Sequence, residues 1–191
     1  MAEPRPDEGM TAEDLFALPE DAWRYELQAG FLLREPHPVL RHGRMLVRLG
    51  ALLEARAAAC GALVVGDFDV ILARRPDTVR APDLAVFSPE QRRSLDPDRP
   101  HEGAPALVIE ILSPSNRPGD MHAKIADYLA AGASLVWVVD PWTDTVRIYR
   151  TLLAPRVLRG EDRLDGGEVL PDVDLCVRDL FGDDLPPPRE R

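Results

Sequence analysis

The sequence predicts a mixed α/β domain whose core runs helix, three strands, helix, strand, with an additional β-hairpin at each end. Residues 40–60 repeat leucines at helical spacing and end before Gly61, as amphipathic helices commonly do. Residues 105–112 and 133–140 are apolar, rich in β-branched residues and of the length of buried strands. Residues 119–129 between them have a helical pattern, so helices and strands alternate.

The N-terminal part of the chain is expected to add a short helix and a hairpin. Residues 11–18 predict the helix, because a threonine is followed three positions later by an acid. Residues 23–27 and 31–35 predict two strands, with Gly30 supplying the turn between them. Residues 62–72 then predict either one long strand or two short ones.

The remaining segments complete the expected sheet. Residues 80–87 predict a partner strand, and residues 88–104 form a long connection that begins with a helical turn, because serine, proline and glutamine occupy its cap positions. Residues 145–150 predict the hairpin mate of the strand at 133–140. Residues 155–177 predict further β-structure, because short apolar runs alternate there with turn residues.

Length and composition fit one domain. The 191 residues are 45% hydrophobic, which is enough for a full core. We expect a flexible tail over residues 1–10, a single domain over 11–182 and a proline-rich flexible tail over 183–191. Cys60 and Cys176 are far apart in the sequence and have no Cys-x-x-Cys partner, so neither zinc nor a disulfide framework is indicated.

Charge and hydropathy exclude two classes of protein. A formal net charge of −10 argues against a protein that coats nucleic acid by bulk attraction, although a local basic face is still compatible with it. No apolar stretch approaches the roughly 20 residues that span a bilayer, and the N-terminus lacks the pattern of a signal peptide. We therefore expect a cytoplasmic protein with no membrane association.

One stretch is locally basic. Arg41, Arg44 and Arg48 are spaced to share one face of the helix expected at 40–60. Such a face either contacts the phosphates of a nucleic acid or is the solvated face of an amphipathic helix. The pattern alone leaves both interpretations open.

Two carboxylates and one lysine are the candidate site residues. Glu110 lies in the middle of an apolar strand, where a carboxylate is costly to bury unless it is protonated, paired or bound to a cation. Asp83 follows a proline at the entry of the neighbouring strand, so both carboxylates can meet at one edge of the sheet. Paired carboxylates on strands are ligands suited to Mg²⁺. Lys124, the only lysine among 23 basic residues, lies on the next helix.

This order of residues resembles the PD-(D/E)XK superfamily of restriction-endonuclease-like nucleases, and most closely its Uma-type restriction endonuclease family. The resemblance covers roughly residues 11–181. The matching residues are Tyr25, Glu26, Leu27 and Gly30, then His42, Val79 to Asp83, Val108 to Ser115, Asp120, Lys124 and Tyr128, and Trp137 to Asp140. Its specific part is Pro-Asp, then Glu-x-x-Ser-Pro-Ser, then Lys-x-x-x-Tyr, in this order.

The resemblance implies a restriction-endonuclease-like core and a metal-dependent endonuclease that hydrolyses phosphodiester bonds in nucleic acid. DNA is the expected substrate, with RNA and a homodimer left open. Asp83 and Glu110 are the implied ligands of Mg²⁺ or Mn²⁺, and Lys124 is the implied catalytic lysine. The further site residues to consider are Glu26, His42, Ser113, Asp120 and Tyr128, with Arg41, Arg44 and Arg48 as nucleic-acid-binding residues.

One departure from the superfamily pattern bears on activity. The orthodox motif has a lysine two residues after the acid, and this chain has Leu112 there. In the Uma-type branch a lysine from the following helix takes that place, and Lys124 matches this pattern. The alternative is a catalytically inactive module that keeps the fold and binds nucleic acid or another partner.

Each candidate residue also has a structural interpretation. Asp83 could cap a turn, Glu110 could form a buried ion pair with an arginine such as Arg80, and Lys124 could be a surface residue paired with an acid of its own helix. A metal-independent hydrolase with Ser113 as its nucleophile is the least supported alternative, because no Gly-x-Ser-x-Gly turn surrounds this serine.

Overall fold

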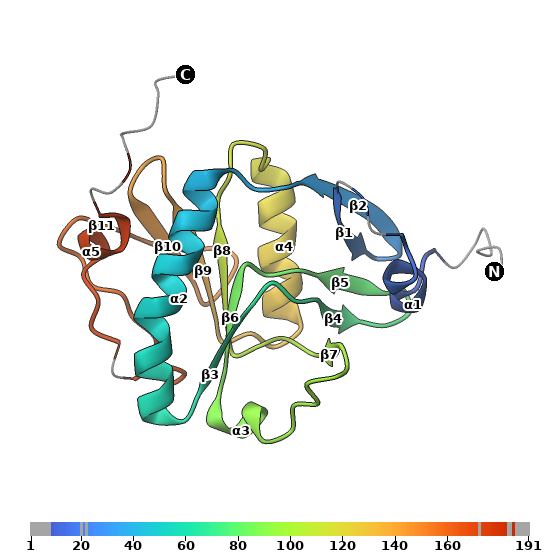
Figure 1. Cartoon of the computed structure of the whole chain (residues 1–191), viewed down its shortest axis with the longest axis horizontal. Helices are drawn as coiled ribbons and strands as arrows, with labels where there is room; N and C mark the ends of the chain where they lie inside the picture. The colour runs from blue at the N-terminus through green and yellow to red at the C-terminus, as the bar shows by residue number, and fades with distance from the viewer. Residues whose placement is uncertain (1–8, 20, 22, 172, 183–184, 186–191) are drawn as a thin grey trace.

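The structure is a computed structural model that describes residues 9–19, 21, 23–171, 173–182 and 185. The tails expected over 1–10 and 183–191 lie almost entirely outside these residues. Within them the chain forms two mixed sheets, which lie side by side, and five helices (Figure 1). The mixed α/β class predicted from the sequence is confirmed.

The larger sheet has six strands in the order β11-β10-β9-β8-β6-β3. Their bounds are Leu63–Gly66 (β3), Leu84–Phe87 (β6), Leu107–Ile111 (β8), Leu135–Asp140 (β9), Thr145–Tyr149 (β10) and Arg156–Arg159 (β11). Only β8 and β9 are parallel neighbours among these strands. This parallel pair requires a crossover, and the crossover carries helix α4 (Pro118–Ala130).

The smaller sheet has five strands in the order β2-β1-β5-β4-β7. Their bounds are Trp23–Gln28 (β1), Phe31–Pro36 (β2), Val70–Ala73 (β4), Thr78–Arg80 (β5) and His101–Glu102 (β7). The predicted hairpin is present as β1 and β2. Helix α1 (Ala12–Phe16) contacts β1 and begins with a capping box in which Thr11 and Asp14 bond each other's main chain.

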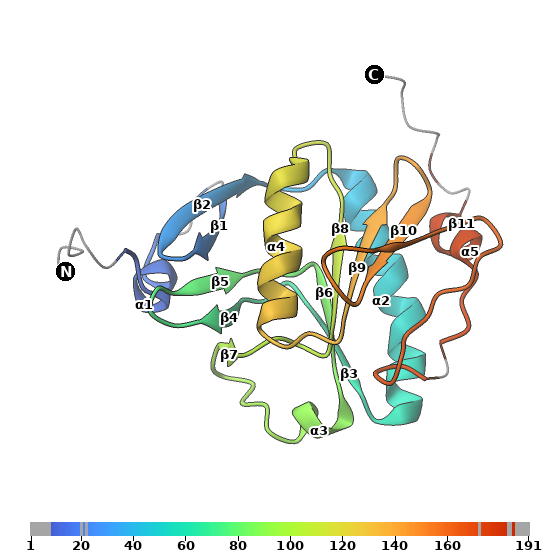
Figure 2. The same cartoon turned by 180° about the vertical axis from the view of Figure 1, so that it is seen from behind.

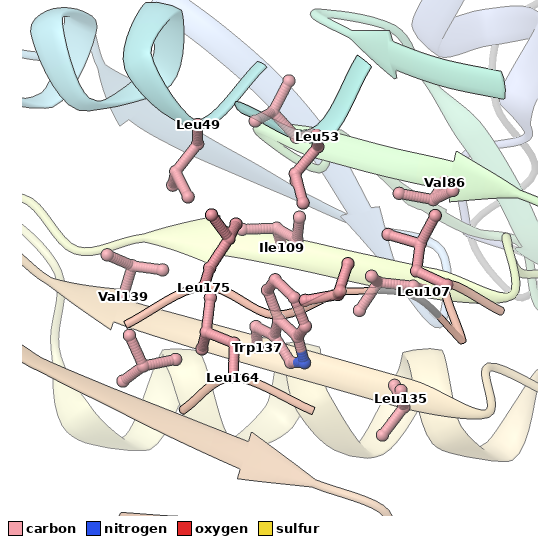
Figure 3. Close-up of a cluster of buried hydrophobic side chains, with 14 of the residues drawn as sticks. Leu49, Leu53, Val86, Leu107, Ile109, Leu135, Trp137, Val139, Leu164 and Leu175 are labelled. Atoms are coloured by element: carbon pink, nitrogen blue, oxygen red, sulfur yellow. The ribbon is translucent and has the colours of Figure 1, made fainter. Parts of the chain in front are cut away.

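Helices α2 (Leu40–Cys60) and α4 cover opposite faces of the six-stranded sheet (Figures 1 and 2). The buried face of α2 packs into the main core, where Leu49 and Leu53 lie over Ile109 and Trp137 (Figure 3). As predicted, α2 ends at Gly61, which has the left-handed φ of 79° that a helix C-terminus often needs.

Helix α4 packs on the other face of the same sheet. Met121, Ile125 and Tyr128 bury against valines such as Val108 and Val136, and they form a second core cluster. Because side chains alternate along a strand, Glu110 of β8 points to this α4 face together with Val108. The strand that the sequence predicted at 105–112 therefore brings a carboxylate to the helix that follows it.

Two segments of the predicted β-structure are each divided between the sheets, and of the alternatives expected over residues 62–72 the two short strands are correct. Residues 62–72 form β3 in one sheet and β4 in the other, and residues 80–87 contribute the end of β5 and all of β6. The second break leaves Ala81, Pro82 and Asp83 between the sheets. Proline cannot donate to a ladder, which explains a break at this point. The break places Asp83 where the two sheets meet.

The sequence analysis missed two short elements. Strand β7 has only two residues, and helix α5 (Val177–Phe181) follows the segment 155–177, for which further β-structure was expected. The helical turn expected after Ser88 is present as α3 (Pro89–Arg92) with its capping box. Among the described residues, no helix combines the length and the apolar character needed to cross a membrane.

Candidate active site

A small cleft of about 30 Å³ lies where the two sheets meet. We call it the acidic cleft, because four carboxylates line it beside a single ammonium group. These residues are Glu26 of β1, Glu35 of β2, Asp83, Glu110 of β8 and Lys124 of α4. They come from five separate segments, and all but Glu35 are buried.

Asp83 is fixed by contacts on both of its oxygens. Strands β6 and β8 are antiparallel, with Leu84 opposite Ile109, so Asp83 lies beside the end of β8. Its Oδ2 accepts a hydrogen bond of 2.7 Å from the Ile111 N–H. Its Oδ1 lies 3.1 Å from Nε2 of His42. Asp83 therefore links two elements and does not merely cap a turn.

His42 reaches Asp83 from the first turns of α2. Its Nδ1 is buried and has no hydrogen-bond partner among the described residues. A buried Nδ1 without a partner is costly whether it is a donor or an acceptor, so the position of this ring is set by the contact of Nε2 with Asp83. Arg24 approaches the same Asp83 oxygen at 3.8 Å and adds positive charge at the edge of the acidic cleft.

Glu110 is the most desolvated carboxylate of the acidic cleft. The Tyr128 hydroxyl donates to its Oε1 at 2.7 Å, and Nζ of Lys124 lies 3.4 Å from its Oε2. Burial raises the pKa of Glu110 to about 8, because the favourable charge of Lys124 is partly offset by the negative charges of Asp83 and Glu26. Glu110 therefore holds a proton near neutral pH unless a cation joins the site.

Lys124 is enclosed by carboxylates. Its Nζ lies 2.8 Å from Glu26, 3.4 Å from Glu110 and 3.8 Å from Glu35. Burial alone lowers the pKa of a lysine, but the three carboxylates outweigh burial and raise the pKa of Lys124 above its ordinary value. Lys124 is therefore a buried ammonium group, and the interpretation of it as a surface residue is wrong.

Glu26 differs from Glu110 because it has more donors. Arg80 donates to its Oε2 at 2.9 Å, and the Ala81 N–H donates to its Oε1 at 3.0 Å. Burial raises the pKa of Glu26, but the charges of Lys124 and Arg80 more than offset it and lower the pKa below the usual value. Arg80 also binds Asp127 at 2.6 Å, so the buried pair that we considered between Arg80 and Glu110 does not form.

The other residues singled out in the sequence are more dispersed. Ser113 lines the acidic cleft, but its hydroxyl contacts that of Ser115 at 2.8 Å, and Asp120 is exposed outside the cleft. Arg41, Arg44 and Arg48 of α2 are partly exposed. Arg48 donates to the carbonyl oxygen of Asp179 at 3.1 and 2.8 Å, so it also joins α2 to α5.

Sequence reasoning missed Arg24 and Glu35 as residues of the acidic cleft. They are cross-strand neighbours in the β1–β2 hairpin, and Arg24 lies two positions before Glu26. Residues two apart on a strand share a face, so this hairpin presents charged side chains to the cleft. The charged alternation within the predicted hairpin was the signal that could have identified them.

Comparisons with known proteins identify the family and the fold of the chain. A family model described as "Uma2: Putative restriction endonuclease" matches residues 12–178. The chain is also similar to a crystal structure titled as a putative nuclease belonging to DUF820 from Anabaena variabilis. That similarity has a TM-score of 0.79 and 22% identity, over 90% of this chain and 97% of the other, and it establishes the fold. No curated protein matches.

Proposed function

This chain belongs to the Uma2 family, and from this premise we propose that it is a divalent-metal-dependent endonuclease that hydrolyses phosphodiester bonds in DNA. One observation carries the proposal. Lys124 comes from α4, yet its ammonium lies 3.4 Å from Glu110 in the cleft that Asp83 also lines. Two carboxylates and a lysine are the groups that the Uma-type resemblance assigns to catalysis.

The donor set of the acidic cleft fits a hard cation. Mg²⁺ binds through one or two carboxylates and keeps several water and phosphate ligands, so it does not require a cage of protein groups. Among the described residues no three carboxylate, imidazole or thiol groups form such a cage. Asp83 and Glu110 supply the pair, and the raised pKa of Glu110 reflects a carboxylate that lacks sufficient positive charge. These two residues would hold Mg²⁺ or Mn²⁺.

When bound, the metal polarises the phosphodiester and lowers the pKa of water. The protein's own residues contribute charge and position. Lys124 remains protonated, so it stabilises negative charge that develops on the phosphate and orients the attacking water, and it does not act as a base. Glu26 and Tyr128 hold Lys124 and Glu110 in place, and His42 orients Asp83.

A second candidate function also has an observation in its favour. The ammonium of Lys124 is already paired with three carboxylates, and the orthodox lysine position is occupied by Leu112. A protein in which these pairs are purely structural would be a catalytically inactive nuclease fold that binds nucleic acid or another partner. Measured turnover separates the two functions.

The test is single-turnover cleavage of labelled DNA with Mg²⁺ or Mn²⁺ at saturating enzyme. We expect wild-type protein to cleave, and Asp83→Asn and Glu110→Gln to lose at least about 10²-fold in rate, because each removes a metal ligand while preserving shape. Asp98→Asn, which changes an exposed carboxylate outside the acidic cleft, is the matched control. Cleavage that survives in both site variants would place the activity elsewhere, and no cleavage by wild type would favour the inactive module.

A further inference from the structure

A second cavity lies beside the acidic cleft, at the first turns of α4. We call it the α4 pocket. It measures about 310 Å³ and is formed by the loop after β8, α4, the end of β9 and β10. Figure 2 shows α4 beside β8, with β9 and then β10 following in the sheet. This volume is at the lower end of the range for small-molecule sites, so it suits one small ligand or one unit of a polymer.

The inner wall of the α4 pocket is apolar. Leu112, Met121, Ile125 and Val138 line it, and Tyr149 adds a half-buried aromatic ring. An apolar wall with an aromatic ring accepts a flat, largely apolar group such as a nucleobase, because every base can stack through its π-face.

Two arginines border the same cavity. Arg117 immediately precedes α4, and Arg147 lies on β10. Neither guanidinium forms a hydrogen bond or ion pair with any residue that the structure describes. Planar guanidinium groups match the oxygens of phosphate, so two of them beside an apolar wall complement a nucleotide.

Asp140 gives the α4 pocket a polar contact at its base. It ends β9, is only 9% exposed and lines the cavity. Its Oδ1 accepts a hydrogen bond of 3.0 Å from the Trp142 N–H. No donor in the described part of the chain reaches its second oxygen, and that oxygen is not fully buried, so it is open to a ligand in the α4 pocket. A ligand with N–H groups would donate to it.

The α4 pocket and the acidic cleft share a wall. Ser113 and Asn116 line both cavities. The Ser113 N–H donates to the Asn116 side chain at 2.6 Å, which closes this loop on itself. A strand with its scissile phosphate in the acidic cleft therefore has a neighbouring nucleotide next to the α4 pocket.

We infer that the α4 pocket binds one nucleoside of the nucleic-acid strand, with guanine as its preferred base. The apolar wall and Tyr149 stack the base, Asp140 accepts from the base edge, and Arg117 and Arg147 bind the flanking phosphates. Guanine presents two adjacent donors, N1–H and the 2-amino group, to a carboxylate. Thymine presents one N–H between two carbonyl oxygens that a carboxylate repels. The strand as the source of this nucleoside rests on the proposed function.

The first test measures binding of mononucleotides to the full chain by calorimetry in EDTA. Without metal ions or a cleavable bond, the result is independent of catalysis. We expect dGMP to bind with a Kd of roughly 0.1–1 mM, and dTMP and deoxyinosine monophosphate, which lacks the 2-amino group, to bind about tenfold more weakly. No saturable binding, or equal binding of the three nucleotides, would overturn the inference.

Variants assign the binding to the pocket. Asp140→Asn keeps an oxygen for the Trp142 N–H but replaces the second oxygen with a donor, so the preference for dGMP over dTMP should disappear or reverse. Arg117→Ala should weaken the binding of dGMP about tenfold and leave the binding of deoxyguanosine unchanged, because only the phosphate contact is lost. Arg99→Ala removes an exposed arginine outside the pocket and should change neither the affinity for dGMP nor that for deoxyguanosine. Unchanged selectivity in Asp140→Asn would show that this residue is structural.

A second arm separates a strand from a free nucleotide as the source of the ligand. A set of oligonucleotides, each with guanine at one position and thymine elsewhere, should bind with an affinity that depends on the position of the guanine. The same set should lose this dependence with Asp140→Asn. Selective dGMP binding without any positional effect would identify a free-nucleotide pocket and overturn the strand assignment. Positional binding without cleavage would retain the α4 pocket while refuting the proposed endonuclease activity.

Discussion

Replacing Lys124 with methionine tests whether the buried ammonium group serves catalysis, stability or both. Methionine keeps an unbranched side chain of similar length, which ends at Cε, and removes the ammonium group. Removing one partner of a buried ion pair costs about 3–5 kcal/mol in free energy of unfolding. We expect about 3 kcal/mol at pH 7, the low end, because Glu26 keeps Arg80 and the Ala81 N–H, and Glu110 keeps Tyr128 and already holds a proton.

The pH dependence of this cost follows from Glu26. Lys124 and Arg80 together depress the pKa of Glu26, so the stabilisation that Lys124 provides is present above the ordinary glutamate pKa of 4.5. It is lost as pH falls through the lowered pKa, where Glu26 becomes protonated. The destabilisation by Lys124→Met should therefore shrink below about pH 4.5. A double variant with Glu26→Gln should recover part of the loss at pH 7, since the buried carboxylate that has lost the Lys124 ammonium is then neutral.

Two assays separate the roles of Lys124. Urea unfolding gives the stability of each variant, with Arg99→Met as an exposed control expected to change it by less than about 0.5 kcal/mol. Single-turnover cleavage is then measured where the variants are folded, and Lys124→Met and Lys124→Arg should both lose roughly 10²–10⁴-fold in rate. Arginine keeps the positive charge, but its guanidinium is wider and planar, so the charge does not occupy the position of the lysine ammonium. Near-wild-type cleavage in the folded Lys124→Met protein would refute the catalytic role.

Three further outcomes are expected. Saturating Mn²⁺ should raise the Tm of wild type by mass action and leave that of an Asp83→Ala, Glu110→Ala variant unchanged, as calorimetry will show. At pH 7, metal binding should release up to one proton from Glu110, whose pKa is raised to about 8, so the calorimetric enthalpy should depend on buffer ionisation at pH 7 and not at pH 9. The double variant Arg41→Ala, Arg44→Ala should reduce the magnitude of the slope of log DNA affinity against log salt concentration by about 2. An unchanged slope would show that these two arginines belong to a solvated helix face and do not contact phosphates.

Most of the fold could be predicted from local patterns. Helix α2 follows from its leucine spacing and Gly61, and β8 and β9 follow from largely apolar runs rich in β-branched residues. The distribution of strands between two sheets could not be predicted, because β3 and β4 differ in their partners and not in their own composition. Pairing between strands distant in sequence is decided by the whole core, which single-segment patterns do not encode.

The candidate active site was less accessible to sequence reasoning. Glu110 stands out because a carboxylate inside an apolar strand is rare. The partners of Glu110 are less obvious, since Lys124 and Tyr128 become its neighbours only when α4 crosses back over β8. Glu26 was considered as a single residue, and its ion pairs with both Arg80 and Lys124 depend on how β1 lies against β5 and α4. The family resemblance is confirmed, whereas the roles of these residues remain predictions.

The position of Leu112 connects the acidic cleft with the α4 pocket. Residues two apart on an extended strand share a face, so position 112 continues the α4 side of β8 on which Glu110 lies. A lysine there would place its stem and charge in the α4 pocket that Leu112 now lines. Supplying the ammonium from α4 keeps positive charge at Glu110 and leaves an apolar wall at 112. The catalytic role proposed for Lys124 and the proposed nucleoside pocket are therefore compatible, because Leu112 keeps the wall of the α4 pocket apolar.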